Sequence, residues 1–302
     1  MSLREGDAVL LGYHGSITNL SDMPAFLSNI RRGRPAPREL VEEITARYER
    51  IGGSPLVEQT ASQARTLEAR LGIPVRAAGR LWGPYPGEVL ADLAKHGAKR
   101  VLSLPLAPQS VHVYHEAART AVGVLERAVE LVLAPAWGAE PALIDAFVES
   151  IEEAISRAPG ARPHVLLTAH SLPLRVLAAG DPYEAAFRAM ANLVKASIEV
   201  KLGLEASVAF QSQGASAEPW LGPDLPTALR GVRAAGIDAV VVAPIGFLAE
   251  HVETLYDLDV EGPLLARDAG IATFLRAPAV GQRPRFIDAL ESVARGALAT
   301  SD

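Results

Sequence analysis

Three carboxylates spaced four residues apart are the side chains of this sequence best suited to handling protons or metal ions. If their segment is helical, Glu253, Asp257 and Glu261 share one face, because a four-residue step rotates a side chain by only about 40°. A solvated acidic face is the structural interpretation of this spacing. The apolar run at 238–244 favours the chemical one, because it predicts a buried strand just before the carboxylates. Ligands of open α/β sheets bind at the carboxyl ends of strands, and an acidic column there can carry protons or hard metal ions.

A histidine at the end of a second predicted strand could work with these carboxylates. His170 lies in the stretch LLTAHSLP at 166–173, where an apolar run ends at a turn containing proline. Histidine exchanges protons near neutral pH and holds transition metals, although a hydrogen-bonded structural histidine would fit the same position. Ser171 does not indicate a hydrolase, since no G-x-S-x-G elbow surrounds it. Both His170 and Glu253 are expected at carboxyl ends of strands in one half of the chain, so they could face each other.

The other histidines carry weaker signals. His112 and His115 have a spacing that a helix could present to a metal, but no third ligand is nearby, so we interpret them as surface residues. His251 lies two residues before the first carboxylate of the column, roughly on the opposite side of a regular helix, which indicates a structural role. His96 and His164 belong to no constellation.

Rings, arginines and a polar loop are further candidates for ligand binding. Tyr13 and His14 end the first predicted strand, just before a glycine turn. The run RRGR at 31–34 most often forms a solvated face, but its guanidiniums could instead clamp ligand carboxylates. The stretch 210–224 holds a polar loop with Trp220, and it fits an ordered structural loop and a ligand-contacting loop about equally well.

Composition excludes several classes of protein. With 29 basic and 35 acidic residues the chain has a net charge of −6, which argues against a protein built around nucleic-acid phosphates. The absence of cysteine excludes disulfides, thiolate zinc sites, a cysteine nucleophile and a cysteine-ligated iron–sulfur cluster. The first residues lack the apolar stretch of a signal peptide, and no run approaches the roughly 18 apolar residues of a membrane span. We therefore expect a cytoplasmic protein without a transmembrane segment.

Apolar, β-branched runs alternate with longer amphipathic stretches along the chain, which is typical of βα units and a mainly parallel sheet. Neither a G-x-G-x-x-G fingerprint nor a Walker A loop accompanies them, so nucleotide binding is not indicated. Strands are predicted at 7–13, 74–79, 100–106, 131–135, 164–169, 206–210, 238–244 and 271–275. Helices are predicted at 23–31, 37–51, 57–71, 85–96, 110–127, 140–156, 183–202, 224–235, 247–257 and 283–299.

The pattern restarts after a segment rich in helix-breaking residues, 156–163, near the midpoint of the chain. At 302 residues the chain is long enough for two domains. We predict an α/β protein of two similar lobes, 1–158 and 159–302, each a mainly parallel four-stranded sheet flanked by helices, with a cleft between them. The last helix could pack back on the first lobe.

Taken together, these motifs resemble the ferrochelatases, which insert ferrous iron into a porphyrin. The resemblance covers nearly the whole chain and depends on AHSLP at 169–173, PWLGPD at 219–224, and HVE with LYD at 251–257. Each motif is weak alone, but their order and separation make a chance match improbable. RRGR at 31–34, with RY at 47–48 and SPL at 54–56, is most similar to the compact Gram-positive type of the family. Members of that type act on coproporphyrin III, which carries four propionates.

The resemblance also implies roles for individual residues. His170 and Glu253 would be the inner pair that handles the metal and the pyrrole protons, and Asp257 and Glu261 would extend an acidic path to the surface. The porphyrin would be contacted by Tyr13, His14, Arg31, Arg47, Tyr48, Ser54 and Tyr114.

The same resemblance predicts the partners of the protein. Iron would be a substrate rather than a resident cofactor, and no iron–sulfur cluster would be bound. We expect a monomer that contacts neighbouring haem-pathway enzymes only transiently, and no nucleic-acid partner.

Two departures from the family pattern bear on the substrate. His14 occupies a position where the Gram-positive type has a tyrosine that can contact the metal, with Tyr13 beside it. The stretch 106–114 is also shorter than its counterpart over the porphyrin. Three alternatives therefore stay open: protoporphyrin IX in place of coproporphyrin III, a cobalt or nickel chelatase for another tetrapyrrole, and a non-catalytic haem or porphyrin carrier.

Overall fold

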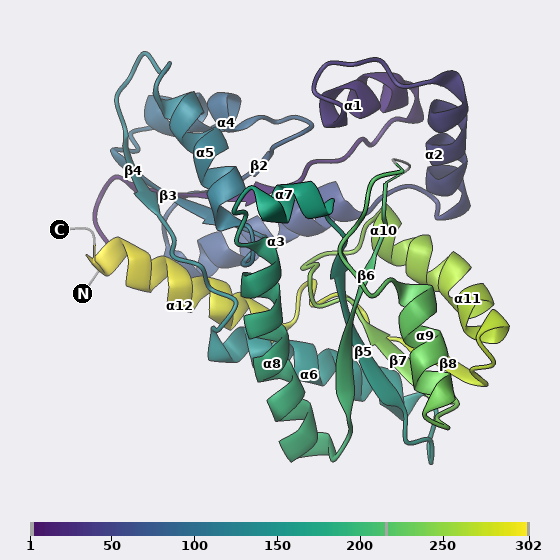
Figure 1. Cartoon of the computed structure of the whole chain (residues 1–302). Coiled ribbons are helices and arrows are strands. Elements are labelled where there is room, and N and C mark those ends of the chain that lie inside the picture. The colour runs from purple at the N-terminus through teal and green to yellow at the C-terminus, as the bar shows by residue number, and fades with distance from the viewer. Residues whose placement is uncertain (1–2, 215–216, 301–302) are drawn as a thin grey trace. The chain divides into compact units, whose positions relative to one another are not determined.

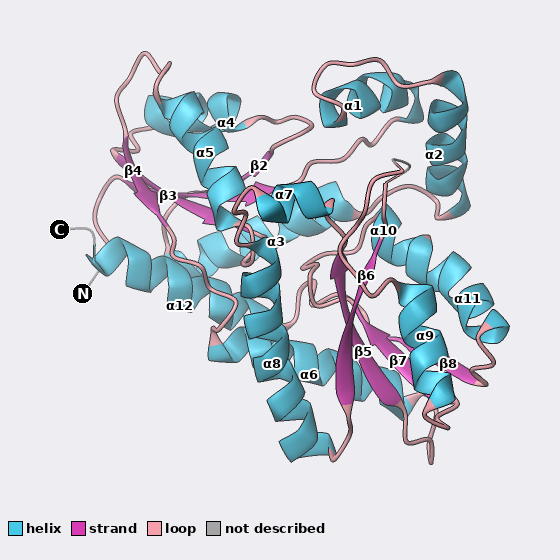
Figure 2. Cartoon of the chain, viewed as in Figure 1, coloured by secondary structure: helices cyan, strands magenta, loops and turns pink. Residues whose placement is uncertain are grey.

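The computed structural model describes residues 3–214 and 217–300 and consists of two compact units (Figure 1). The first unit comprises Met1–Trp137 and Phe286–Asp302, and the second comprises Gly138–Arg285. Each unit contains one four-stranded parallel sheet flanked by helices, which confirms the predicted fold class (Figure 2).

The sheet of the first unit has the strand order β2-β1-β3-β4. Its strands are β1 (Asp7–Tyr13), β2 (Val75–Gly79), β3 (Arg100–Pro105) and β4 (Glu130–Leu133). Its helices are a 3₁₀ turn (Leu20–Asp22), α1 (Met23–Ile30), α2 (Arg38–Arg50), α3 (Leu56–Leu71), α4 (Pro86–Lys95), α5 (Val111–Val122) and α12 (Pro284–Thr300).

The interior of the first unit follows from the buried strands. Strand β1 is buried along its whole length, as expected for a central strand of a parallel sheet that is covered on both faces. One face packs on α4 and α5, with Leu10 and Leu90 in a common apolar cluster. Helix α3 packs against β2. The ring of Trp137 stacks on Phe286 with centroids 6.4 Å apart, which attaches α12 to this unit.

The sheet of the second unit repeats the topology in the order β6-β5-β7-β8. Its strands are β5 (His164–His170), β6 (Ala206–Gln211), β7 (Ala239–Ala243) and β8 (Thr273–Arg276). Its helices are α6 (Pro141–Ser156), α7 (Leu174–Ala178), α8 (Tyr183–Leu202), α9 (Leu225–Ala234), α10 (Val252–Leu255), a π-helical turn (Asp257–Glu261) and α11 (Gly262–Asp268).

Side-chain alternation along the strands divides the core of the second unit into two layers. Leu166, Val240 and Val242 pack with α9 and α11 in one cluster. Because successive side chains of a strand point to opposite faces, the intervening residues face α6 and α8, which pack on β7 and β6. The carboxyl ends of β5 and β7 are thereby fixed from both sides.

The predicted strands all appear with bounds within two residues, but one helix was wrong. A continuous helix at 247–257 was predicted, whereas residues 244–250 form a loop and α10 begins only after His251. The amide of Gly246 donates to the carbonyl of Thr168, so this loop is bound to the end of β5 instead of coiling. Helix α5 also ends at Val122 rather than at 127, and α7 and α11 were not predicted.

Packing sets the division between the units. Helix α6 packs on α8 and β7, so it groups with the second unit, and the division falls after Trp137 rather than near residue 158. Helix α12 groups with the first unit. Within 3–214 and 217–300, no helix is both long enough and apolar enough to cross a membrane.

Candidate active site

The topology of each sheet creates one position where ligands of α/β proteins bind. In the first sheet β2 and β3 lie on opposite sides of β1, and in the second sheet β6 and β7 lie on opposite sides of β5. The chain connections therefore run in opposite directions on either side of the boundary between β1 and β3, and likewise between β5 and β7. Side chains just beyond the carboxyl ends of such strand pairs face a crevice. His170 ends β5 and Glu253 follows β7, while Tyr13 ends β1 and Tyr114 follows β3.

His170 and Glu253 are in direct contact in the second unit. Nδ1 of His170 lies 3.0 Å from Oε2 of Glu253, and both side chains are about one-third exposed. The ring nitrogen donates to the carboxylate, and Nε2 then has no hydrogen-bond partner among the described residues. The hydroxyl of Tyr183 donates to the backbone carbonyl of His170 at 2.7 Å and fixes the end of the strand. The pair therefore presents one oriented imidazole nitrogen to a ligand.

The charge around His170 controls its protonation. Burial by itself lowers the pKa of His170, but the charge of Glu253, the hydrogen bond to it and the charge of Asp257 outweigh this effect. The pKa of His170 is consequently raised above its usual value of 6.5. A histidine so tuned takes up a proton readily near neutral pH.

A buried amide holds Glu253 in place. Gln211, only 4% exposed at the end of β6, accepts a hydrogen bond from the hydroxyl of Thr168 at 2.7 Å. Its Nε2 donates to the backbone carbonyl of Glu253, also at 2.7 Å. Thr168 belongs to β5, so Gln211 connects the strand of His170 to the segment of Glu253.

The acidic column is built on a widened helical turn rather than on a regular α-helix. The amides of Val260 and Glu261 both donate to the carbonyl of Tyr256 at 3.0 Å, so the second bond spans five residues. Pro263 has no N–H and cannot continue the α-helical ladder, which favours this rearrangement. Such π turns occur frequently at functional sites.

Asp257 lies on this turn and is bound by the end of β6. The hydroxyl of Ser212 donates to Oδ2 of Asp257. Ser212 has a φ of 59°, a left-handed conformation that is uncommon for a residue other than glycine. Strained backbone of this kind is found at functional sites, where the surrounding structure holds it.

The predicted metal set does not form a closed cage. Within the described parts of the chain, no three His, Asp or Glu side chains gather closely enough to hold an ion together. His170 and Glu253 meet, and Asp257 is one turn further along the segment. Glu261 ends the π turn and is half-buried.

His251 has a structural role at the start of α10 and is not placed as a metal ligand beside His170. Its Nδ1 accepts a hydrogen bond from the amide of Glu253 at 3.2 Å, so it caps α10. The ring also packs edge-on against Phe247, with centroids 4.7 Å apart. Burial lowers the pKa of His251, in opposition to the charges of Glu253 and Glu250. The neutral ring is the form that can accept from the amide.

In the first unit, rings gather at the carboxyl ends of β1 and β3. Tyr13 is buried, at 3% exposed, and burial raises the pKa of its phenol. His14, the next residue, is exposed. Tyr114 packs against Gly12, where a Cβ would lie 3.4 Å from its ring. Burial raises the pKa of Tyr114, while the positive charge of Arg80 opposes the rise.

Arg80 was not predicted as a site residue. Its amide donates to the carbonyl of Tyr13 at 2.9 Å, which places it beside the two rings that end β1. Its Nε is buried and has no hydrogen-bond partner within the described residues. The sequence shows Arg80 only as a single arginine after a short predicted strand, which does not indicate a site residue. The pairing of β1 with β2 is what brings Arg80 to Tyr13.

The remaining predicted porphyrin contacts lie on and around α1 and α2. Nε of Arg31 is buried without a described hydrogen-bond partner, whereas Arg47 pairs with Glu43 at 2.9 Å. Tyr48 is buried, and its hydroxyl lies 3.2 Å from that of Ser16 in the loop after β1. Ser54 is half-buried and accepts from the amide of Leu56 at 3.4 Å, at the start of α3.

The expectation that His115 lies on the surface was wrong. His115 is 5% exposed, and its Nε2 donates to the carbonyl of Ala134 at 2.9 Å. Its Nδ1 therefore accepts from the hydroxyl of Ser103, also at 2.9 Å. His112, by contrast, is exposed as expected. The hydrogen bonds hold α5 against β3 and β4, so His115 has a structural role.

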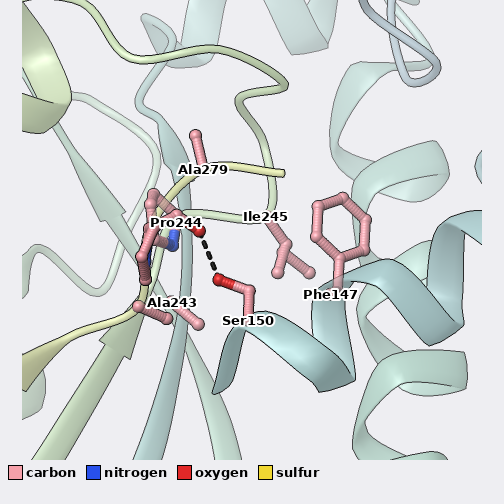
Figure 3. Close-up of a pocket in the computed structure, with 8 residues that line it drawn as sticks. Phe147, Ser150, Ala243, Pro244, Ile245 and Ala279 are labelled. Atoms are coloured by element: carbon pink, nitrogen blue, oxygen red, sulfur yellow. Dashed lines mark hydrogen bonds between the residues drawn. The ribbon is translucent and has the colours of Figure 1, made fainter. Parts of the chain in front are cut away.

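A small pocket in the second unit is lined by none of these residues (Figure 3). Its walls come from α6, from the end of β7 and from the chain after β8, and Ser150 donates a hydrogen bond to the carbonyl of Pro278 across it. It is lined by Phe147, Ser150, Ala243, Pro244, Ile245, Ala277, Pro278 and Ala279. No titratable side chain lines it, so it offers no acid–base or metal chemistry.

Comparison with known proteins shows the family of the chain. The Ferrochelatase family matches residues 6–298. The chain belongs to the ferrochelatase family. It is 34% identical to the ferrochelatase of Acidobacterium capsulatum, across 98% of this chain and 96% of that protein. It is 32% identical to the coproporphyrin III ferrochelatase of Bacillus subtilis, across 97% of this chain and 98% of that protein.

A solved structure shows the same fold. SirB from Bacillus subtilis with Fe³⁺ superposes with a TM-score of 0.63 at 15% identity, over 98% of this chain and 96% of that one. The family model and the relatives above confirm the family that the sequence motifs predict. The activity of the chain is that of a ferrochelatase, a lyase-class chelatase that inserts iron into a porphyrin in haem biosynthesis.

Proposed function

We propose that this ferrochelatase inserts Fe(II) into coproporphyrin III, with His170 and Glu253 as the pair that exchanges protons and metal at the porphyrin. The observation that carries the assignment is their 3.0 Å contact at the carboxyl ends of β5 and β7. The contact leaves Nε2 of His170 available to a ligand while Glu253 stabilises positive charge on the ring.

Metal insertion requires two pyrrole protons to leave and the ion to lose its water. Neutral His170 accepts the two pyrrole protons one after the other at Nε2, and each imidazolium that forms is stabilised by the Glu253 carboxylate at Nδ1 until its proton leaves to solvent. The raised pKa of His170 suits this step, because the proton is held more firmly than by an isolated imidazole. Positioned acid–base groups of this kind contribute about 10²–10⁴-fold to a rate.

Asp257 and Glu261 continue the path away from His170. Their carboxylates lie one after the other on the π turn that follows Glu253. Carboxylate oxygens bind hard, partly hydrated cations and also carry protons. Since the ion is a substrate that must move on, pairs of ligands along a path serve it better than a closed cage.

Residues of the first unit bind the porphyrin in this proposal. Tyr114 supplies a ring surface, and Arg31, Arg47 and Arg80 supply positive charge for propionates. The unpartnered, buried Nε atoms of Arg31 and Arg80 support this role, because a buried donor that lacks a partner is costly unless a ligand satisfies it. Of the two rings at the end of β1, His14 is exposed and Tyr13 is buried, so we assign the ligand contact to His14.

The choice of coproporphyrin III depends on the similarity to chelatases of that name and on these arginines. Four propionates need more positive partners than the two of protoporphyrin IX. The test is an anaerobic assay with Fe(II), or with Zn(II) as a surrogate, in which each porphyrin is followed separately by visible absorbance. Catalytic conversion that is faster with coproporphyrin III is expected. Faster conversion of protoporphyrin IX would overturn the substrate, and tight binding without turnover of either would indicate a carrier.

A further inference from the structure

A partly buried arginine on the edge strand of the second sheet contacts both ends of the segment 250–259, which carries the first two carboxylates of the acidic column. Arg276, the last residue of β8, has a side chain that is 13% exposed. Its Nε and Nη2 donate to the two carboxylate oxygens of Asp259, at 2.8 and 2.6 Å. Its Nη1 donates to Oε1 of Glu250 at 2.5 Å. One guanidinium therefore holds two carboxylates that are nine residues apart in sequence.

The two carboxylates lie on either side of the residues that handle the metal. Glu250 immediately precedes the cap of α10, and it also accepts from the amide of Ala279 at 2.8 Å and from the hydroxyl of Thr254 at 2.6 Å. Asp259 lies within the π turn itself. Between them stand Glu253 and Asp257. The guanidinium thus fixes where this segment begins and how its widened turn is placed.

The acidic residues of this segment differ in their hydrogen-bond partners: Arg276 binds two of them, and a histidine and a serine bind two others. Asp259 and Glu250 both pair with Arg276, whose single positive charge offsets one of their two negative charges. Burial lowers the pKa of the guanidinium, but the hydrogen bond to Asp259 and the charges of both carboxylates outweigh it and raise that pKa. Glu253 is hydrogen-bonded by His170, and Asp257 accepts a hydrogen bond from Ser212. The fork geometry of arginine suits the double contact, whereas a lysine ammonium offers a single point of charge.

We propose that Arg276 is a positioning residue for iron insertion. It holds the π turn in the geometry that aligns Glu253 and Asp257, and it engages Glu250 and Asp259, which would otherwise compete for the ion. This inference rests on the proposed roles of Glu253 and Asp257. Arg276 acts through these carboxylates and not by contact with substrate.

The test compares three variants of the full chain. Arg276→Gln removes the fork, and Arg276→Lys keeps a charge that cannot span both carboxylates. Asp259→Asn is a milder change at a side chain that is 39% exposed, and it keeps the experiment informative if the arginine variants fold poorly. Arg230→Gln, on the exposed surface of α9 in the same unit, is the matched control.

Hydrogen exchange at the amides of Val260 and Glu261 reports directly on the π turn, because both donate to Tyr256. We expect at least tenfold faster exchange in the three variants, and unchanged exchange in Arg230→Gln. With Zn(II) as metal, kcat should fall about 10- to 100-fold and KM for the metal should rise, because misplacement by about 1 Å can cost on the order of 100-fold. Affinity for coproporphyrin III, measured by fluorescence quenching, should stay within twofold.

Wild-type turnover and wild-type amide exchange in both Arg276→Gln and Asp259→Asn would overturn the inference. Full activity and exchange in Arg276→Lys would show that charge alone matters and would overturn the positioning role of the fork. Failure of the proposed function is distinguishable, because it appears as absent turnover in the wild-type protein, while the exchange measurement still tests the effect of Arg276 on the turn.

Discussion

Gly246→Ala should disable the site through a steric clash alone. A Cβ at position 246 would lie 2.5 Å from Cβ and 2.7 Å from Cα of Ala169, the residue before His170. Ordinary contacts begin at 3.4 Å, so the loop after β7 and the end of β5 must separate by about 0.7–0.9 Å. That displacement acts directly on the 3.0 Å contact between His170 and Glu253. We expect kcat to fall on the order of 100-fold, with a loss of about 1–3 kcal/mol in the free energy of unfolding.

Gly231→Ala is the matched control for this prediction. Gly231 lies in α9, and an added Cβ would meet nothing within 4 Å. Alanine favours a helix interior over glycine by up to about 1 kcal/mol, so stability should stay equal or increase while kcat stays unchanged. The assay is steady-state Zn(II) insertion together with denaturant unfolding of both variants. The argument is refuted if Gly246→Ala keeps kcat within twofold and its unfolding free energy within a few tenths of a kcal/mol.

Three further outcomes follow from charge and hydrogen bonding. Glu253→Gln should lower the pKa of His170, because burial remains while the carboxylate charge that raises this pKa is removed. NMR titration of the metal-free protein measures the pKa, and an unchanged value would contradict the prediction. The stabilisation from protonated His170 is present below about pH 6.5 and is lost as pH rises through the folded pKa, and it should shrink in this variant. Burial lowers the pKa of His115, so its contribution to stability is present above about pH 6.5 and is lost as pH falls through the folded pKa. His115→Gln, which can keep both hydrogen bonds, should therefore weaken the loss of stability between pH 7.5 and 5.5 in denaturant titrations, and an identical loss in both proteins would count against the buried neutral ring. Arg80→Met should weaken coproporphyrin III binding about tenfold or more by fluorescence titration, since a hydrogen bond to a charged group contributes about 1.5–3 kcal/mol; unchanged affinity would remove Arg80 from the porphyrin site.

The strands and the proximity of His170 to Glu253 were predictable from the sequence for physical reasons. Buried parallel strands are continuous apolar runs, and the turn residues after β5 and β7 mark their carboxyl ends. Since ligand sites of such sheets lie at those ends, the amino-acid sequence alone indicated that His170 and Glu253 could face each other. Their 3.0 Å contact is the arrangement that this reasoning anticipated.

Other features of the site depend on contacts that local sequence does not encode. The π turn arises where Pro263 stops the α-helical ladder and Arg276, from a later strand, binds Asp259. Arg80 gains its importance only through the pairing of β1 with β2. His115 was predicted at the surface because its side chain is polar. The sequence does not show that two buried groups, the Ser103 hydroxyl and the Ala134 carbonyl, hydrogen-bond to its ring.

The most direct test of the account is the turnover and porphyrin affinity of His170→Ala, with His164→Ala as control. His164 begins the strand that His170 ends, and it hydrogen-bonds to Ser207 at 2.8 Å, away from Glu253. The account predicts that His170→Ala loses Fe(II) and Zn(II) insertion while still binding coproporphyrin III, and that His164→Ala keeps both. Insertion by His170→Ala at a rate near that of the wild-type protein would contradict the central role of the His170–Glu253 pair.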